Sequence, residues 1–188
     1  HVRSRRQRQM CIRDRLSALM LTVSVFVTLC VMLYSSSQSF ENDRVPIAVF
    51  NPTFLILSAG VSNAFLTGDL FNLYVGFEIL LVSSFVLIML GGTRDRLRSG
   101  TVYVVVSLVS SSIFLIAIAM IYAATGTVNM AQLAIRLPQI DQGAAQLAQV
   151  MLLIAFGVKA AVFPLSAWLP DSYPTAPAPV TAVFAGLL

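Results

Sequence analysis

Charged residues are scarce in this sequence. Only 11% of its 188 residues are Asp, Glu, Lys or Arg, whereas 57% are hydrophobic, and the mean hydropathy is +0.85. Soluble domains carry roughly 25% charged residues. This shortage excludes an ordinary water-soluble domain and indicates a membrane protein.

Residues that commonly bind metals or react as nucleophiles are also rare. His1 is the only histidine, and Cys11 and Cys30 stand alone without a CxxC spacing. Two isolated cysteines provide neither a disulfide framework nor a metal site. The sequence contains no nucleotide-binding loop and no nucleophile motif. We therefore predict no metal, no cofactor and no enzymatic activity.

Long apolar runs make up most of the chain. Each is long enough to cross roughly 30 Å of hydrocarbon as a helix. Their number and length predict an all-α fold, a polytopic helix bundle in the cell (inner) membrane. The predicted spans are 16–34, 46–66, 70–90, 101–123 and 144–163, with a sixth beginning near 178 and still running at Leu188. The sequence therefore indicates a transmembrane fragment over 16–188.

Residues 1–15 form a basic head with six of the eleven arginines. It has no apolar periodicity and could be a disordered tail, an RNA-binding arm or a segment foreign to the protein. The arginine-rich segment 91–100 follows the third span, so it lies across the membrane from the head. The positive-inside rule cannot hold for both. We place 91–100 in the cytoplasm, interpret the head as non-native and predict no nucleic-acid partner.

Two charged residues lie inside predicted spans. Glu78 is near the centre of 70–90, and Lys159, the only lysine, is within 144–163. A charge at the centre of a membrane helix costs at least roughly 2.5–3.5 kcal/mol, so each is a candidate functional residue. The alternatives are that Lys159 extends its ammonium to the membrane surface, and that Glu78 forms a structural ion pair or stays protonated.

A lysine at this position has one property that arginine lacks. Burial disfavours the charged forms of lysine and glutamate, while a nearby opposite charge favours them. A Glu78–Lys159 couple can therefore change protonation state near neutral pH, and the two titrations would be coupled. Arginine stays protonated in proteins. We predict that the site requires a cation able to release its proton.

The segment after Lys159 is rich in proline. Pro164 removes a helical hydrogen bond, which predicts a break in the helix. Freed backbone groups at membrane depth are tolerated only inside protein or beside water. The alternative is an exit loop with Trp168 as an interface anchor. Asp171 in this segment is a weaker functional candidate, most often a solvated loop residue.

Three further features have structural explanations. Asp69 begins the third span, where an N-cap is the favoured role, with Thr67 assisting; we keep it as a weaker functional candidate. The serine run 110–112 predicts a close helix-packing face. Residues 128–137 have apolar positions at helical spacing and predict a short amphipathic helix along the interface, or an ordinary connector.

Two blocks, "LTGDLFNLYVGFEILLVSSFVLIML" and "GVKAAVFPLSAWLPDSYPTAPAPVTAVFAGLL", closely resemble the antiporter-like membrane subunits of Mrp-type cation/proton antiporters and respiratory complex I. Phe77 before Glu78, where complex I subunits usually have tryptophan, is more similar to the D-type Mrp subunits. The resemblance implies a fragment of an inverted-repeat fold with a broken helix. It also implies that Glu78 and Lys159 form a proton-translocating couple.

Three functions follow as hypotheses. The first, implied by the resemblance, is a membrane subunit of a Na⁺/H⁺ antiporter, with other subunits, lipid, protons and monovalent cations as partners. The second is the homologous proton-pumping subunit of a respiratory or hydrogenase complex. The third is a structural membrane subunit in which Glu78 and Lys159 form a static ion pair.

Overall fold

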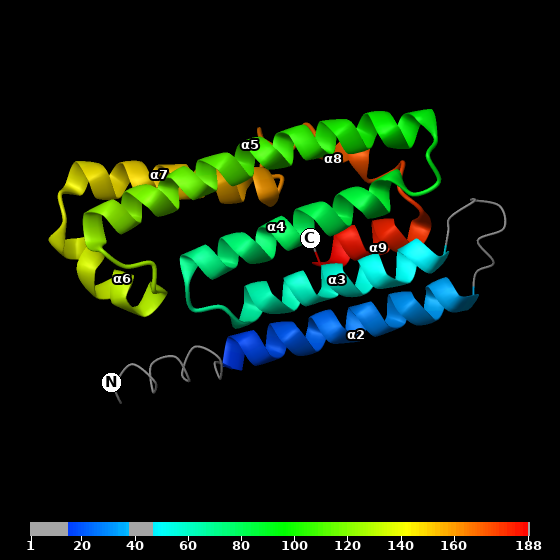
Figure 1. Cartoon of the computed structure of the whole chain (residues 1–188), viewed down its shortest axis with the longest axis horizontal. Coiled ribbons are helices and arrows are strands. Elements are labelled where there is room, and N and C mark those ends of the chain that lie inside the picture. Colours follow the sequence, from blue (N-terminus) through cyan, green and yellow to red (C-terminus); the bar gives the residue numbers. More distant parts are fainter. Residues whose placement is uncertain (1–14, 38–46, 188) are drawn as a thin grey trace.

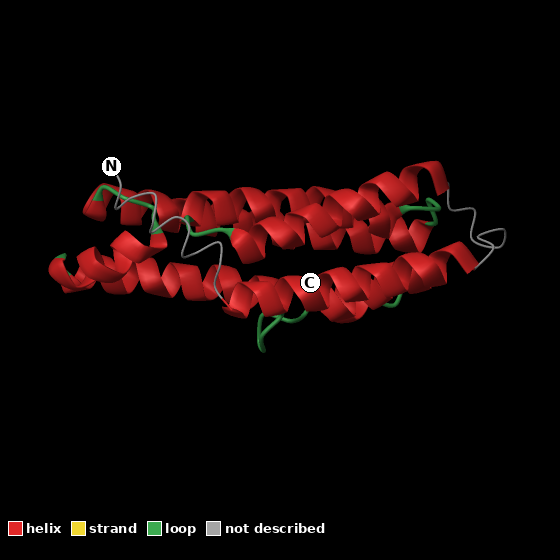
Figure 2. Ribbon diagram, turned by 90° about the horizontal axis from the view of Figure 1, so that it is seen from below, coloured by secondary structure: helices red, strands yellow, loops and turns green. Residues whose placement is uncertain are grey.

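The structure, a computed structural model, describes residues 15–37 and 47–187, and within them the fold is all-α, as predicted. Apart from one isolated β-bridge, these residues contain no extended pairing. The helices run nearly parallel and lie in two layers (Figures 1 and 2). They are α2 (Arg15–Ser37), α3 (Ile47–Leu66), α4 (Leu70–Met89), α5 (Arg94–Thr125), α6 (Met130–Arg136), the 3-10 turn η2 (Leu137–Gln139), α7 (Gln142–Lys159), α8 (Leu169–Ser172) and α9 (Ala178–Leu187).

Four of these helices, α2 to α5, are long and apolar enough to cross a membrane. Their outer faces expose large apolar side chains such as Phe26, Leu29 and Val105, as expected for surfaces that face lipid or other membrane helices. The predicted basic head, except for Arg15, lies outside the described residues. The bundle therefore contains four membrane-length helices with apolar outer faces.

Helix α5 begins earlier than the sequence predicted, at Arg94 rather than at Thr101. The Thr93 side chain caps it by accepting a hydrogen bond from the Arg96 N–H. Asp95 adds a negative charge in the first turn, where the helix dipole favours it. Residues 94–100 of the arginine-rich segment 91–100 therefore form the first turns of a 32-residue helix.

The start of α4 is fixed by a cap and a bridge. Asp69 Oδ1 accepts hydrogen bonds from the N–H groups of Phe71 (2.9 Å) and Asn72 (3.1 Å), which confirms the predicted N-cap. An antiparallel bridge joins Asp69 to Asn129, and Asn129 in turn caps α6. This connection holds the short α6 at the end of the bundle where α4 begins (Figure 1).

Helix α7 packs against α5. Ser110 Oγ donates a 2.9 Å hydrogen bond to the Ala155 carbonyl across this contact, and Ser111 is also buried. Ser112, in contrast, is exposed and bonds to its own helix. Two of the three serines therefore form the predicted packing face.

Two apolar clusters form the core. One joins α2, α3, α4, α5 and α9 around Phe54, Leu87 and Phe184, and the other joins α4, α5, α6 and α7 around Phe114. Phe77 packs against both clusters. Glu78, the next residue, therefore lies on a helix held between the two clusters.

Candidate functional site

Glu78 lies in the middle of α4 among aromatic rings. The rings of Phe77, Phe114 and Phe156 meet with centroids 5.1–6.1 Å apart. Tyr74, one turn before Glu78, interacts electrostatically with its carboxyl group. The Oε1 atom of Glu78 is buried and has no hydrogen-bond partner. An unpartnered buried acceptor is costly. The Oε1 atom of Glu78 is therefore able to take up a proton or to accept a hydrogen bond from a mobile donor.

Lys159 is the last residue of α7. Helix α7 runs beside only one half of α5 and stops near the middle of the bundle (Figure 1). A cation in the last helical turn interacts favourably with the helix dipole. The dipole of α7 therefore stabilises the Lys159 ammonium. This contribution could not be predicted from the sequence, because it depends on where α7 ends.

A Schellman turn ends α7 directly after Lys159. The Val162 N–H donates to the Gly157 carbonyl (2.9 Å) and the Ala161 N–H to the Val158 carbonyl (3.2 Å), the pair of bonds that defines this motif. Ala161 has φ = 49°, a left-handed conformation that usually calls for glycine. The turn satisfies carbonyl groups that would otherwise be free at membrane depth.

Pro164 lies beyond this turn, so the predicted fifth span, 144–163, ends as a helix at Lys159. The proline prevents the helix from resuming, but the Schellman turn makes the break. Asp171 belongs to α8, and its side chain lies outside the described part of the structure.

The structure contradicts the role of Trp168 as an interface anchor. Its side chain is 8% exposed, and its Nε1–H donates a 3.1 Å hydrogen bond to the Val158 carbonyl. Its ring packs on Tyr103 with centroids 5.4 Å apart. Trp168 is buried because its indole N–H satisfies a carbonyl at the end of α7, and it thereby fixes the residue next to Lys159.

Glu78 and Lys159 interact without touching. The charge of Glu78 acts on the Lys159 ammonium. Within the described part of the chain, however, no ion pair within 4.0 Å joins the two residues, and the Lys159 side chain makes no hydrogen bond. The two groups thus occupy neighbouring helices as separated partners. The structure thus shows no permanent salt bridge between these two residues.

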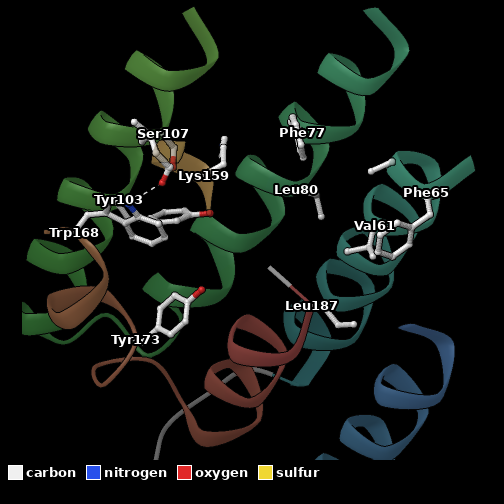
Figure 3. A pocket seen from close by; sticks show the side chains of 12 residues that line it. Val61, Phe65, Phe77, Leu80, Tyr103, Ser107, Lys159, Trp168, Tyr173 and Leu187 are labelled. Carbon is white, nitrogen blue, oxygen red and sulfur yellow. Dashed lines mark hydrogen bonds between the residues drawn. The ribbon is translucent and has the colours of Figure 1, made fainter. Parts of the chain in front are cut away.

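A cavity of about 120 Å³ adjoins Lys159, enough for several water molecules. Lys159, Ser107 and Tyr103 lie on one side of it, and Val61, Phe65 and Leu187 lie opposite (Figure 3). Lys159 is therefore half-buried and lines an internal cavity.

Sequence analysis missed Tyr74, Tyr103 and Ser107 as neighbours of the charged pair. Tyr74 precedes Glu78 by four residues and Ser107 follows Tyr103 by four, which places each pair on one helix face. This spacing was a usable signal, but only in combination with the charged residues. Outside such a context, hydroxyl groups in apolar helices have ordinary packing roles.

Among the described residues, no group of His, Cys, Asp and Glu side chains could hold a metal ion. Membrane-length helices, a helix that ends inside the bundle, a half-buried glutamate on α4 and a half-buried lysine beside a cavity define a multi-pass helical membrane protein with internal ionisable residues. Such residues mark proton and ion pathways in membrane proteins.

Comparison with known proteins identifies the family. Residues 67–188 match the family described as NADH:quinone oxidoreductase/Mrp antiporter, TM, and the chain belongs to it. The chain is 43% identical over 176 residues to the D-type subunit of the Na(+)/H(+) antiporter of Bacillus subtilis, covering 93% of this chain and 35% of that protein. It therefore spans about a third of the length of this curated relative.

Two solved structures share the fold. One belongs to the membrane-bound sulfane sulfur reductase, an archaeal respiratory membrane complex, with a TM-score of 0.86 and 34% identity over 92% of this chain and 35% of that one. The other belongs to the Mrp complex from Dietzia sp., with a TM-score of 0.80 and 36% identity over 93% of this chain and 32% of that one. The same fold thus occurs in an Mrp complex and in an archaeal respiratory membrane complex.

Proposed function

We propose that this chain is part of a membrane subunit of a multisubunit Na⁺/H⁺ antiporter and that it passes protons between Glu78 and Lys159. The observation that carries the proposal is the separated pair. Glu78 has a buried, unpartnered oxygen, and Lys159 senses its charge without contacting it. The relationship to the D-type subunit of an antiporter supports the same function.

The pair works as a relay because each protonation changes the charge felt by the other group. When Glu78 is ionised it favours the ammonium form of Lys159, and when Glu78 is protonated that attraction is lost. Lys159 then gives up its proton more readily to water in the cavity. Cation movement elsewhere in the complex would be coupled to this step, and the coupling would be reciprocal.

The experiment uses everted membrane vesicles that contain the full-length subunit together with its partner subunits. A dye reports ΔpH as Na⁺ or K⁺ is added. Wild type is expected to dissipate ΔpH on cation addition, and Lys159→Ala is expected to reduce this response to background at an unchanged membrane level. A wild-type response that survives in Lys159→Ala would make the lysine structural.

A double variant, Glu78→Leu with Lys159→Leu, tests the third hypothesis. A buried ion pair can often be replaced by apolar residues without loss of stability. If the pair is only structural, the double variant should assemble and transport like wild type. If it is a relay, the double variant should assemble but transport nothing.

A respiratory pump subunit is the second candidate, because the fold is also found in an archaeal respiratory complex. In that case proton movement would follow addition of an electron donor and would not require Na⁺. Genes for iron–sulfur subunits beside the coding sequence would favour this function, whereas genes for other Mrp subunits would favour the antiporter.

A further inference from the structure

Three buried hydroxyl groups form a row, and two of the residues that carry them, Tyr103 and Ser107, line the cavity. Ser84 Oγ lies 2.6 Å from the Tyr103 hydroxyl, and Ser107, one turn further along α5, interacts with the same hydroxyl. All three residues are buried, with exposed fractions of 0%, 6% and 5% in the order Ser84, Tyr103, Ser107. The row connects α4 to α5 in the interior of the bundle.

The hydrogen bonds fix the direction of this row. Ser84 Oγ lies 2.6 Å from the Leu80 carbonyl of its own helix. A serine hydroxyl has one proton to donate, and a carbonyl can only accept, so Ser84 donates to Leu80. The Tyr103 hydroxyl must then donate to Ser84, so its own oxygen can accept: one lone pair receives the Ser107 hydroxyl and the other remains for a further donor.

The Lys159 ammonium needs such acceptors. It carries three donors and no acceptor, and in the described chain it makes no hydrogen bond. Most of the cavity wall is apolar, including Phe77 and Leu80, and cannot accept a hydrogen bond. The hydroxyl oxygens on the cavity wall belong to Tyr103, Ser107 and Tyr173, and of these Tyr103 and Ser107 lie on the Lys159 side of the cavity (Figure 3).

We propose that the oxygens of Tyr103 and Ser107 form a second resting position for the Lys159 ammonium, inside the cavity and away from Glu78. This inference rests on the proposed proton relay and deepens it. The lysine side chain would alternate between a position near Glu78 and a position held by Tyr103 and Ser107, directly or through one water. Tyr103 and Ser107 are thus positioning residues that keep the charged lysine inside the cavity after it leaves the glutamate.

Tyr103→Phe tests the proposal because it removes the hydroxyl group of Tyr103 and keeps the aromatic ring. The ring can still pack on Trp168 and Phe184, and Ser84 keeps its bond to the Leu80 carbonyl. Ser107→Ala provides a second variant with the same expected direction. Tyr122→Phe, the same chemical change at an exposed position of the same helix, is the matched control.

The measurement is dye-reported ΔpH in vesicles containing the full complex, over a range of pH and Na⁺ concentration. A hydrogen bond to a charged group contributes enough to change an equilibrium by about tenfold or more. We expect Tyr103→Phe to lower the maximal response about tenfold, with an unchanged half-maximal Na⁺ concentration. Tyr122→Phe should match wild type.

The pH profile separates positioning from folding. Without the acceptors the charged lysine is less stable in the cavity, so the active range of Tyr103→Phe should move to lower pH. The described titratable groups that face Lys159 or Glu78 are Tyr74 on α4, Tyr103 on α5 and Tyr173 after α8. A merely destabilised protein would lose amplitude equally at every pH.

The outcomes are distinguishable. If wild type and Tyr122→Phe respond to Na⁺, Lys159→Ala does not, and Tyr103→Phe and Ser107→Ala both behave like wild type at every pH, then the relay stands and this inference is wrong. If Tyr103→Phe loses amplitude without a displaced pH profile, the inference is also wrong. If wild type itself shows no Na⁺ response, the proposed function fails and the inference fails with it.

Discussion

At the residue scale, the two charged side chains were the most predictable part of the site. Glu78 and Lys159 stand out because a charge inside a membrane helix is expensive. Their separation was not predictable, since it depends on how α4 and α7 are placed by packing at Phe77, Phe114 and Phe156. The sequence identified the two residues, and the structure adds that their side chains do not touch.

Asp69 makes a different kind of contribution, through the N-cap of α4. Asp69→Ala removes the acceptor for two backbone N–H groups and should lower the free energy of unfolding by about 1 kcal/mol. Asp69→Asn keeps a side-chain acceptor and should lose only part of this. Thermal denaturation of the purified protein in detergent measures both.

Transport separates the cap from a role in proton transfer. Asp69→Asn cannot carry a proton as a carboxyl group does, but it still caps the helix. We expect it to transport like wild type in vesicles. Loss of transport in Asp69→Asn at a normal membrane level would contradict the assignment and restore Asp69 as a transport residue.

At the element scale, the decisive feature is the end of α7. Sequence analysis predicted a break from Pro164, but placed the helical span through residue 163. The actual end at Lys159 could not be predicted, because the left-handed turn residue is Ala161 and not the glycine that marks most such turns. The result of this early end is that Lys159 lies at the negative pole of a half-helix.

The left-handed conformation of Ala161 after α7 can be tested by its effect on stability. An L-residue other than glycine in the left-handed region costs roughly 1–2 kcal/mol, partly offset by the greater backbone freedom of glycine in the unfolded chain. Ala161→Gly should therefore stabilise the protein by up to about 1 kcal/mol. Ala160→Gly, at φ −80°, is the control and should not stabilise it. Equal melting temperatures for Ala161→Gly and wild type would argue against the strained turn.

At the scale of the whole molecule, the all-α membrane bundle was predictable because long apolar runs leave few alternatives. The placement of Trp168 in the core was not, since its indole N–H pairs with the Val158 carbonyl in a contact made only by the fold. The cavity and the Ser84–Tyr103–Ser107 row likewise depend on residues from different helices. Single-sequence patterns do not specify such contacts.

The bundle places an acid and a base on different helices without contact between them. Glu78 is carried by a continuous helix, and Lys159 by the end of a broken one. The family relationship and the cavity beside Lys159 support proton transfer at this point. In the proposed relay, Lys159 must be able to release its proton.

The most direct test replaces Lys159 with arginine in the full-length subunit within its complex. Arginine keeps the positive charge but does not deprotonate in proteins. We expect Lys159→Arg to reach the membrane at the wild-type level and its cation-dependent ΔpH response to fall to background, as in Lys159→Ala. A wild-type response in Lys159→Arg would show that only the charge matters and would contradict the relay.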